Sequence, residues 1–364
     1  RYLKELFIKQ KLYSGNEFAF KEVFDKSSFD DNCIVVKEVV KLLQKYQIKY
    51  KQKHQFLGDF FEKLLNEAIK QEVGQYFTPL PLTSFICKSL PIDKIINEKN
   101  DNKEIDIIPY CIDYASGSGH FLTDLMTEID LNINKFSVQY IKGGKRAKDK
   151  FDSIKSNYRW AKEYIYGIEK DYRLAKTTKI STFLNGDGDA NIICGDGLDN
   201  FYKSKTYKGI LKTNSLKIDN LNFDILVSNP PYSVDGFKTT IDNGKDSFEL
   251  FSDLTDKSNE IEILFVERAK QLLKEGAVAG IILPDSFFVT NTYKKIRDIL
   301  LLNFNIKGML ELKSKAFMKT TKNTIIIFLE KKQKDRNKID KLIIQFFSNF
   351  KDISFDNKNI FSEY

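Results

Sequence analysis

The sequence predicts an α/β fold: a doubly wound, mostly parallel, Rossmann-like sheet of seven strands. From about residue 105 onward, short apolar runs alternate with longer segments in which apolar residues recur every three or four positions. Strands that alternate with helices are joined by crossovers and lie parallel in one sheet. Four of the runs end in turns of glycine, proline or acidic residues. Because such a sheet binds ligands beyond the carboxyl ends of its strands, we expect the site there.

Each expected strand is a run of apolar residues bounded by polar or turn residues. In chain order the strands are expected over 105–113, 164–169, 191–194, 223–228, 277–283, 306–311 and 323–329. Helical spacing of apolar residues predicts helices over 121–133, 172–184, 262–273 and 293–302. The last two strands follow each other without an obvious helix, so we expect them to form a terminal antiparallel hairpin.

We expect three domains along the chain. Residues 1–70 have apolar residues at helical spacing, which predicts a small helical N-terminal domain. Residues 71–330 carry the sheet, and residues 331–364 are a charged linker and the start of a C-terminal region, with one more strand over 342–347. The basic segment 134–160 and the polar segment 233–257 interrupt the alternation and are expected to be loops. Long loops at the ligand edge of a sheet are usually functional or mobile.

The composition indicates a soluble globular protein without a zinc site or a disulfide framework. Charged residues make up 30% and hydrophobic residues 42% of the 364 residues, and no run has the length of a membrane span or the pattern of a signal peptide. The four cysteines and two histidines lie far apart, which favours buried thiols in a reducing cytoplasm. The net charge of +8 fits a polyanionic partner and a lysine-rich coding bias equally well. The chain starts with Arg1 rather than Met, so we expect a piece of a longer protein.

The most informative motif is Asn229-Pro230-Pro231-Tyr232, which closes the apolar run 223–228. It offers a side-chain carbonyl, a rigid backbone carbonyl and a flat ring close together. The two prolines fix φ and carry no backbone N–H, so nearby carbonyls can accept from a ligand. This arrangement suits a planar amino group that attacks a methyl donor. By itself the motif is equally compatible with a strand that ends in a proline turn, where Tyr232 only packs.

Three further turns follow expected strands. The run Asp113-Tyr114-Ala115-Ser116-Gly117-Ser118-Gly119 lets the backbone approach a ligand closely at a helix N-terminus, as in sites for several nucleotide cofactors. Glu169 ends the second strand, where a carboxylate can accept both hydroxyls of a ribose or simply favour a helix N-terminus. Asp196 follows the third strand, where it can accept from an adenine amine or form an Asp-Gly turn. All four turns in order at strand ends indicate one shared site.

With these turns, the chain resembles the N6-adenine DNA methyltransferases of restriction–modification systems. The resemblance is nearest to the modification (M) subunits of type I enzymes and to related single-chain type IIG methylase-nucleases, and it covers roughly residues 55–330. That family carries Asp-Pro-x-x-Gly-Ser-Gly where this chain has Tyr114 and Ser116 as mild departures. The other motifs that carry the resemblance are Leu57-Gly58-Asp59-Phe60-Phe61-Glu62, Gly74-Gln75-Tyr76-Phe77-Thr78-Pro79, Leu283-Pro284-Asp285 and Thr321-Lys322-Asn323-Thr324.

The resemblance implies a methyltransferase domain over 71–330, with S-adenosyl-L-methionine as cofactor, no metal, and a role for each motif. Glu169 is expected to hold the ribose and Asp196 to meet the adenine of the cofactor. Tyr232 is expected to stack on a base flipped out of duplex DNA, and Phe317 to contact its other face. The remaining cofactor residues implied are Gln75, Tyr76, Phe77, Thr78 and Pro79 at the methionine end, and Asp113, Ser116, Gly117, Ser118 and Gly119 along the cofactor. The catalytic residues implied are Asn229, Pro230, Pro231 and Tyr232.

The chemistry agrees with this assignment. The lone pair of an adenine N6 is delocalised into the ring, so the amine is a poor nucleophile. Two acceptors placed tetrahedrally, the Asn229 side-chain carbonyl and the Pro230 backbone carbonyl, draw it toward sp³ and stabilise the positive charge that develops on nitrogen. Attack on the sulfonium methyl is then mostly a matter of positioning, and no general base is needed before it.

Two other readings keep the motifs but change the function. Release-factor glutamine methyltransferases and some ribosomal RNA methylases also carry Asn-Pro-Pro-aromatic, although they lack Gly-Gln-Tyr-Phe-Thr-Pro. A non-catalytic, methylase-like subunit of a DNA-defence complex is the third possibility. Under the main interpretation the partner is double-stranded DNA. Too few residues follow Leu329 for a recognition domain of roughly 100 residues, so we expect a specificity (S) subunit or a C-terminal recognition domain, together with a restriction nuclease component.

Overall fold

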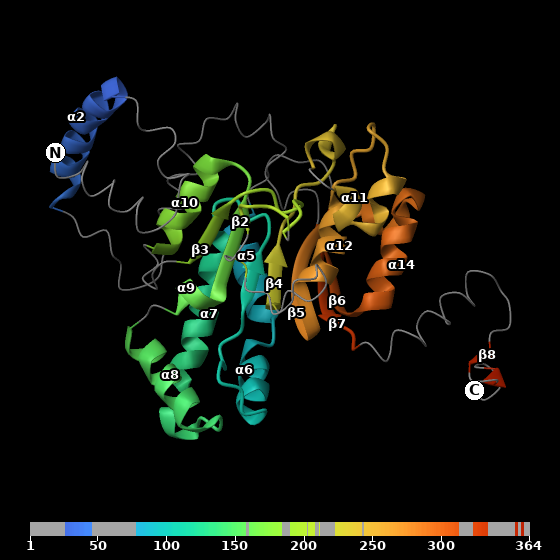
Figure 1. Cartoon of the computed structure of the whole chain (residues 1–364), viewed down its shortest axis with the longest axis horizontal. Coiled ribbons are helices and arrows are strands. Elements are labelled where there is room, and N and C mark those ends of the chain that lie inside the picture. The colour runs from blue at the N-terminus through green and yellow to red at the C-terminus, as the bar shows by residue number, and fades with distance from the viewer. Residues whose placement is uncertain are drawn as a thin grey trace.

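The computed structural model contains a seven-stranded sheet whose strand order is β3-β2-β1-β4-β5-β7-β6 (Figure 1). It describes residues 26–45, 78–157, 160–183, 190–201, 203–207, 211, 223–241, 244–312, 323–333, 354–355 and 358–359. The strands are β1 (Cys111–Asp113), β2 (Ile165–Glu169), β3 (Asn191–Cys194), β4 (Phe223–Ser228), β5 (Leu273–Pro284), β6 (Phe304–Leu312) and β7 (Thr324–Lys331). This confirms the predicted fold class.

The strand order reverses between β1 and β4. The first five strands pair in parallel, and β7 lies between β5 and β6 and runs antiparallel to both. The expected terminal hairpin is therefore present, with β7 inserted beside β5. Chain order runs outward from β1 to β3 on one side and from β4 to β5 on the other, which makes the β1–β4 boundary the switch point where ligands bind.

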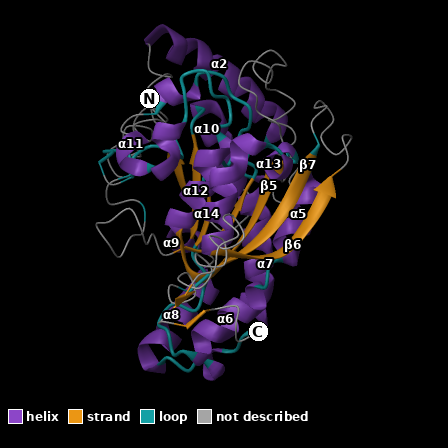
Figure 2. Cartoon of the chain, turned by 90° about the vertical axis from the view of Figure 1, so that its right-hand side faces the viewer, coloured by secondary structure: helices purple, strands orange, loops and turns teal. Residues whose placement is uncertain are grey.

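Helices cover both faces of the sheet. On one face, α7 (His120–Lys135) packs against β1 and β2 together with α5 (Leu80–Ser89) and α10 (Tyr172–Thr182). On the other, α12 (Glu262–Leu272) packs against β5 and α14 (Lys294–Asn303). Figure 2 places α12 and α14 on one side of the strands and α5 and α7 on the other. Right-handed crossovers that proceed in opposite directions from the switch point require this arrangement.

The first strand is shorter than predicted, because pairing starts at Cys111 rather than at 105. Pro109 has no N–H to donate to a ladder. The backbone N–H of Tyr110 donates to a side chain, the Asp224 carboxylate, at 2.8 Å instead of to a neighbouring strand. The apolar residues Ile107 and Ile108 are nevertheless buried in the core.

The expected loop over 134–160 was wrong in two respects. It holds η2 (Val138–Tyr140) and α8 (Gly144–Asn157), with α9 (Ala161–Tyr164) just after it. Its basic side chains also lie at the opposite edge from the turns after β1 and β4. Lys142 pairs with Asp101 at the end of α6 (Ile92–Asp101) at 2.9 Å, and Lys150 pairs at 2.8 Å with Glu163, just before β2. These acids draw the segment to the amino ends of the strands.

The segment 233–257 does lie beside the carboxyl ends, and it too has short helices. They are η4 (Phe237–Thr240), α11 (Gly244–Ser247) and η5 (Glu249–Asp253). After β5 come α13 (Ser286–Val289) and η6 (Asn291–Tyr293). Of the expected N-terminal helical domain, the structure describes only α2 (Lys26–Leu43). The strand expected over 342–347 lies outside the described residues, and the two-residue strands β8 (Ser354–Phe355) and β9 (Lys358–Asn359) follow.

No helix in the described ranges combines the length and apolar character needed to cross a membrane. Nor do three His, Cys, Asp or Glu side chains gather there in the way that metal ligands would.

A buried ion cluster joins β4 to the segments around it. Asp224 is 1% exposed, accepts from the Tyr110 N–H at 2.8 Å and pairs with Lys99 at 3.4 Å and with Lys274. Lys99 is also buried and pairs with Glu104 at 3.0 Å. The cluster fixes the start of β4 against α6, and so fixes the strand that leads into the site.

We expect Asp224→Asn to lower the free energy of unfolding by about 3 kcal/mol, because it leaves the Lys99 ammonium buried with one partner fewer. Asparagine can still accept from the Tyr110 N–H, so the loss reports the charge. Urea denaturation followed by circular dichroism measures it. The control is Glu98→Gln at the exposed Lys94–Glu98 pair on α6, for which less than about 0.5 kcal/mol is expected. Equal losses in the two variants would contradict this account.

Candidate active site

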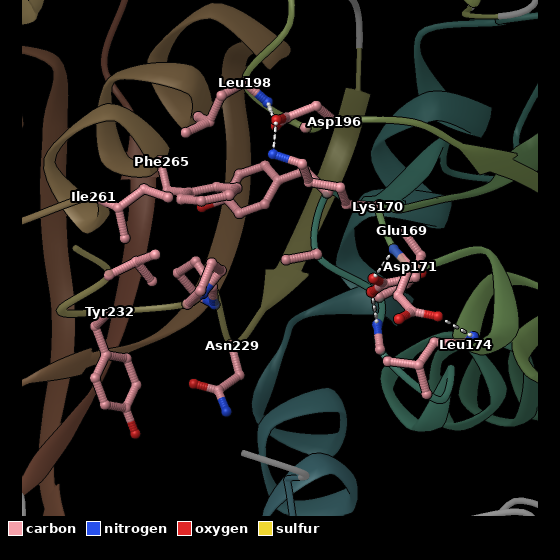
Figure 3. A pocket seen from close by; sticks show the side chains of 18 of the residues that line it. Glu169, Lys170, Asp171, Leu174, Asp196, Leu198, Asn229, Tyr232, Ile261 and Phe265 are labelled. Atoms are coloured by element: carbon pink, nitrogen blue, oxygen red, sulfur yellow. Dashed lines mark hydrogen bonds and ion pairs between the residues drawn. The ribbon is translucent and has the colours of Figure 1, made fainter. Parts of the chain in front are cut away.

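A cavity of about 440 Å³ lies at the carboxyl ends of β1, β2, β3 and β4. Its walls are the four turns after these strands, together with Thr78, the segment 234–241 and the first turn of α12. Figure 3 shows Glu169, Asp171 and Leu174 on one side of it, Asn229 and Tyr232 on another, and Asp196 with Leu198 beyond them. The sheet topology thus brings the four motif-bearing turns to one hollow.

Most of the predicted site residues line this cavity. Those in its wall are Thr78, Ser116, Gly117, Ser118, Glu169, Asp196, Asn229, Pro230, Pro231 and Tyr232. Pro79, Asp113 and Gly119 are not part of the wall. Gln75, Tyr76, Phe77 and Phe317 lie outside the described residues. The cavity therefore unites residues that are up to about 150 positions apart in the chain, from Thr78 to Tyr232.

The glycine-rich turn after β1 is held against β2 by its backbone. The Ser116 N–H donates to the Ile168 carbonyl at 2.8 Å, and the Gly117 N–H donates to Glu169 Oε2 at 2.8 Å. Gly119 has φ +86°, and a Cβ there would meet Thr178 Cγ2 at 2.7 Å. A left-handed conformation and a close neighbour both require glycine at this position.

Glu169 is the buried carboxyl of the cavity. It accepts from the backbone N–H of Gly117 and of Asp171, each at 2.8 Å. Burial raises its pKa to about 7, although these two N–H donors lower it. Nearby, the Ser116 hydroxyl is buried and has no hydrogen-bond partner among the described residues. These groups fit a ligand with hydroxyl donors, such as the ribose of a nucleoside cofactor.

Asp113 lies beneath the cavity and connects two of its walls. Its Oδ1 accepts from the Ala115 N–H at 3.0 Å and from the Ser228 hydroxyl at 2.7 Å. Burial raises the pKa of Asp113 to about 7, and the two hydrogen bonds oppose the shift. The side chain points from β1 toward β4 rather than into the hollow. Asp113 therefore holds the turn after β1 at a fixed place relative to Asn229.

Asp196 closes the far end of the cavity. Its Oδ1 accepts from the Leu198 N–H at 2.9 Å, and its Oδ2 pairs with Lys170 Nζ at 2.7 Å. Lys170 Nζ also lies 3.4 Å from the Thr240 hydroxyl. A Cβ at Gly197 would come within 2.3 Å of the Tyr114 carbonyl oxygen, so this turn too requires glycine. The Lys170 side chain thus joins the turns after β2 and β3 to the segment that follows Tyr232.

The Asn229–Tyr232 turn presents acceptors and a ring to the cavity. The Asn229 amide nitrogen donates to the Thr78 hydroxyl at 3.1 Å, an assignment of the amide that turns its oxygen away from Thr78. Tyr232 is 4% exposed and lies in the wall. Thr78 belongs to the motif expected at the methionine end of the cofactor, so the two motifs meet at this hydrogen bond.

Sequence reasoning missed several residues of the wall. Lys170 and Asp171 follow Glu169 directly, and their position at a strand end was the available signal. Phe265, whose ring lies 5.1 Å from that of Tyr114, comes from α12, and Ile261 directly precedes that helix; both have only the helical spacing of a core face. Thr240 belongs to a segment flagged by its polarity and its place after the motif, without any single residue standing out.

The raised pKa of Asp113 has a consequence for stability. A carboxyl whose pKa is higher in the folded than in the unfolded protein stabilises the fold fully below the unfolded value, near 4, and loses that contribution as pH rises through 7. We expect the stability of wild-type protein relative to Asp113→Asn to fall by about 2–3 kcal/mol between pH 5 and pH 8. Urea denaturation of both proteins at several pH values measures the difference, and a pH-independent difference would contradict the assignment.

The amino-acid sequence is similar to those of known DNA methylases. The family model described as N-6 DNA Methylase matches residues 52–364. The Type II restriction enzyme and methyltransferase RM.Eco57I of Escherichia coli is 24% identical over 373 residues, which cover 92% of this chain. The chain spans only 37% of that relative's length.

Two solved structures share the fold. A protein described as a class I S-adenosylmethionine-dependent methyltransferase from Listeria monocytogenes matches with a TM-score of 0.53 at 16% identity, over 88% of this chain and 79% of that one. A chain of a type I restriction–modification system matches with a TM-score of 0.51 at 16% identity, over 84% of this chain and 58% of that one. The expected cofactor, S-adenosyl-L-methionine, agrees with this fold and with the family match. With a family model that spans most of its length, the chain belongs to the N-6 DNA Methylase family.

Proposed function

We propose that this chain is the methyltransferase part of a restriction–modification protein and transfers a methyl group from S-adenosyl-L-methionine to the N6 of an adenine in DNA. The observation that carries the proposal is the shared cavity. Asn229 and Tyr232 line the same hollow as Glu169 and Asp196, so an amine acceptor site and a nucleoside site adjoin. Two ligands that must react with each other need this proximity.

The proposed cofactor site follows the strand ends. Glu169 would accept from the ribose hydroxyls, and Asp196 from the adenine amine. The backbone of Gly117 and Ser118 would lie close to the ligand. Thr78, which is hydrogen-bonded to Asn229, would lie near the methionine end. When bound, the cofactor supplies an electrophilic methyl group on a positively charged sulfur.

The target site is proposed at the Asn229–Tyr232 turn. The Asn229 side-chain oxygen and the Pro230 carbonyl would accept from the two hydrogens of the adenine N6 and stabilise the positive charge that develops on it. Tyr232 would stack on the flipped base. Apolar side chains such as Phe265 and Ile261 line the same hollow and would help to exclude water from the reacting atoms.

The complete protein is proposed to act on double-stranded DNA. We propose three parts for the chain: a helical region over 1–70, the methyltransferase domain over 71–330, and a linker over 331–364 that begins a C-terminal region. Target choice would come from a specificity (S) subunit or a C-terminal recognition domain, and cleavage from a nuclease component. The restriction activity in the name of RM.Eco57I, a relative of which this chain spans about a third, supports that arrangement.

We expect Asn229→Ala to lower kcat for methyl transfer by about 100- to 1,000-fold, since it removes one preorganised acceptor. Tyr232→Ala should abolish transfer, whereas Tyr232→Phe should retain most of it, because stacking needs only the ring. Transfer of tritiated methyl groups to duplex DNA, with identification of N6-methyladenine by mass spectrometry, measures the reaction. Calorimetry with S-adenosylhomocysteine checks that cofactor binding survives. Turnover like that of the wild type in either alanine variant would refute the assignment, and methylation of protein or RNA alone would redirect it.

We expect the affinity for S-adenosylhomocysteine to rise about tenfold between pH 6 and pH 8, because a carboxyl with a pKa of about 7 becomes ionised over this range and accepts better from ribose hydroxyls. Glu169→Gln should bind more weakly at pH 8 and show a flatter profile. Titration calorimetry at each pH provides the data, with Asp113→Asn as the control for the second carboxyl that titrates in this range. An unchanged slope in Glu169→Gln would exclude Glu169 as the source.

A further inference from the structure

The residue that follows the Asn229–Tyr232 turn has an unusual backbone conformation. Ser233 has φ +56° and is one of two non-glycine residues with positive φ in the described chain. Left-handed backbone is sparsely populated by residues with a Cβ and persists where the surroundings impose it. Because Pro230 and Pro231 have no N–H, the first donors that can fix this turn from within its backbone are those of Tyr232 and of the residues after it.

A fully buried carboxylate accepts a hydrogen bond from Ser233. Glu262, the first residue of α12, is 0% exposed, and its Oε2 accepts from the Ser233 N–H at 3.2 Å. Its Oε1 accepts from the Tyr293 hydroxyl at 2.5 Å. The next backbone donor, the Val234 N–H, bonds to the Asn259 carbonyl at 2.9 Å. Two consecutive residues after the motif are therefore held to the start of α12.

This arrangement does not belong to the cavity wall. Neither Glu262 nor Tyr293 lines the hollow, although Tyr232 and Val234 on either side of Ser233 do. Tyr293 is 5% exposed, and burial followed by the neighbouring Glu262 raises its pKa well above the usual range. The hydroxyl therefore stays protonated and donates to the carboxylate. A buried acceptor held by its own donor is a rigid support for a turn.

We propose that Glu262, oriented by Tyr293, is a positioning residue that sets the Pro230 carbonyl and the Tyr232 ring for the target base. The inference rests on the proposed function for its kinetic consequence. The carboxylate lies outside the cavity wall and so would not touch either substrate. Instead, it fixes the exit of the turn, and through it the direction in which the acceptor and the ring face the cavity.

The same helix offers a matched control. Glu267 is also buried on α12, and its carboxylate accepts from two backbone N–H groups, those of Glu249 at 2.5 Å and Leu250 at 3.2 Å. These belong to η5, away from the Asn229–Tyr232 turn. Loss of this carboxylate removes equivalent hydrogen bonds from the same element without releasing the turn.

The test compares Glu262→Ala, Glu262→Gln, Tyr293→Phe and Glu267→Ala in the complete protein, with any partner subunit it requires. We expect kcat to fall about 100-fold in Glu262→Ala, as a misplaced acceptor would cause, and the dissociation constant for S-adenosylhomocysteine to stay within about twofold. Glu262→Gln should keep most activity, because its amide oxygen can accept from Ser233 while its nitrogen donates to the Tyr293 oxygen. Glu267→Ala should lower stability but leave kcat per folded molecule unchanged.

Tyr293→Phe decides the matter if Glu262→Ala does not fold. It keeps the ring and removes the donor that orients the carboxylate, together with a hydrogen bond from Ser286, so we expect kcat about five- to tenfold lower with cofactor affinity unchanged. Adding Ser233→Gly to either impaired variant should recover part of kcat, since glycine adopts positive φ without help. Wild-type kcat in both Glu262→Ala and Tyr293→Phe, or an equal loss in Glu267→Ala, would overturn the inference.

A failure of the proposed function would look different. In that case the wild-type protein itself would not methylate DNA. Hydrogen exchange would still test whether Glu262 fixes the backbone at Ser233. The peptide over 229–236 should exchange faster in Glu262→Ala than in the wild type and Glu267→Ala, and equal exchange in all three would refute it.

Discussion

The carboxyl group of Asp113 joins the two strands between which the sheet reverses its order. One oxygen accepts from the turn after β1 and from the Ser228 hydroxyl at the end of β4. The glycine-rich turn and the Asn229–Tyr232 turn are therefore placed relative to each other by a bond in the core rather than by loop contacts. Burial favours the neutral form of this carboxyl, so the join depends on hydrogen bonds more than on charge. If this join shifted, the two halves of the cavity would move apart.

Helix α12 supports the same edge from the other face of the sheet. It carries buried polar side chains that bond to the backbone of two segments, the one that follows Tyr232 and the turn after β3. Besides Glu262 and Glu267, Arg268 donates to the carbonyls of Leu198 at 3.2 Å and Asp199 at 2.7 Å, between the rings of Phe201 and Phe248. Gln271 donates to the Ser247 carbonyl at 2.6 Å. Backbone groups of these segments are therefore fixed by side chains of this helix, and these hydrogen bonds offset part of the energetic cost of burying its polar groups.

The sequence was sufficient for the sheet and for the four motif-bearing turns of the cavity wall, because both depend on local patterns. Apolar runs, their polar ends and the order of the four turns were enough to predict which residues would meet at one edge. The position of Asp113 could not be predicted in this way, because whether a strand-end side chain faces a ligand or a neighbouring strand depends on the pairing of β1 with β4. The basic segment 134–160 was misplaced for a related reason. Its ion pairs to Asp101 and Glu163 are contacts between distant parts of the chain, which a charge pattern does not reveal.

Three carboxyls of the cavity, those of Glu169, Asp171 and Asp196, differ in whether a cation compensates their charge. Asp171 is bonded to Arg173 at 2.6 Å, and Asp196 is paired with Lys170 at 2.7 Å. In the described part of the chain, Glu169 has backbone N–H donors but no ion pair with a cation. Its pKa is accordingly raised to about 7, whereas an arginine lowers that of Asp171. A ligand that brings hydroxyl donors or positive charge to this end of the cavity would add to the two backbone N–H donors of Glu169, and its binding would favour the ionised carboxylate. Burial makes Glu169 costly to ionise, and a ligand with matching donors offsets that cost. Glu169 would therefore favour such a ligand over one that lacks these donors.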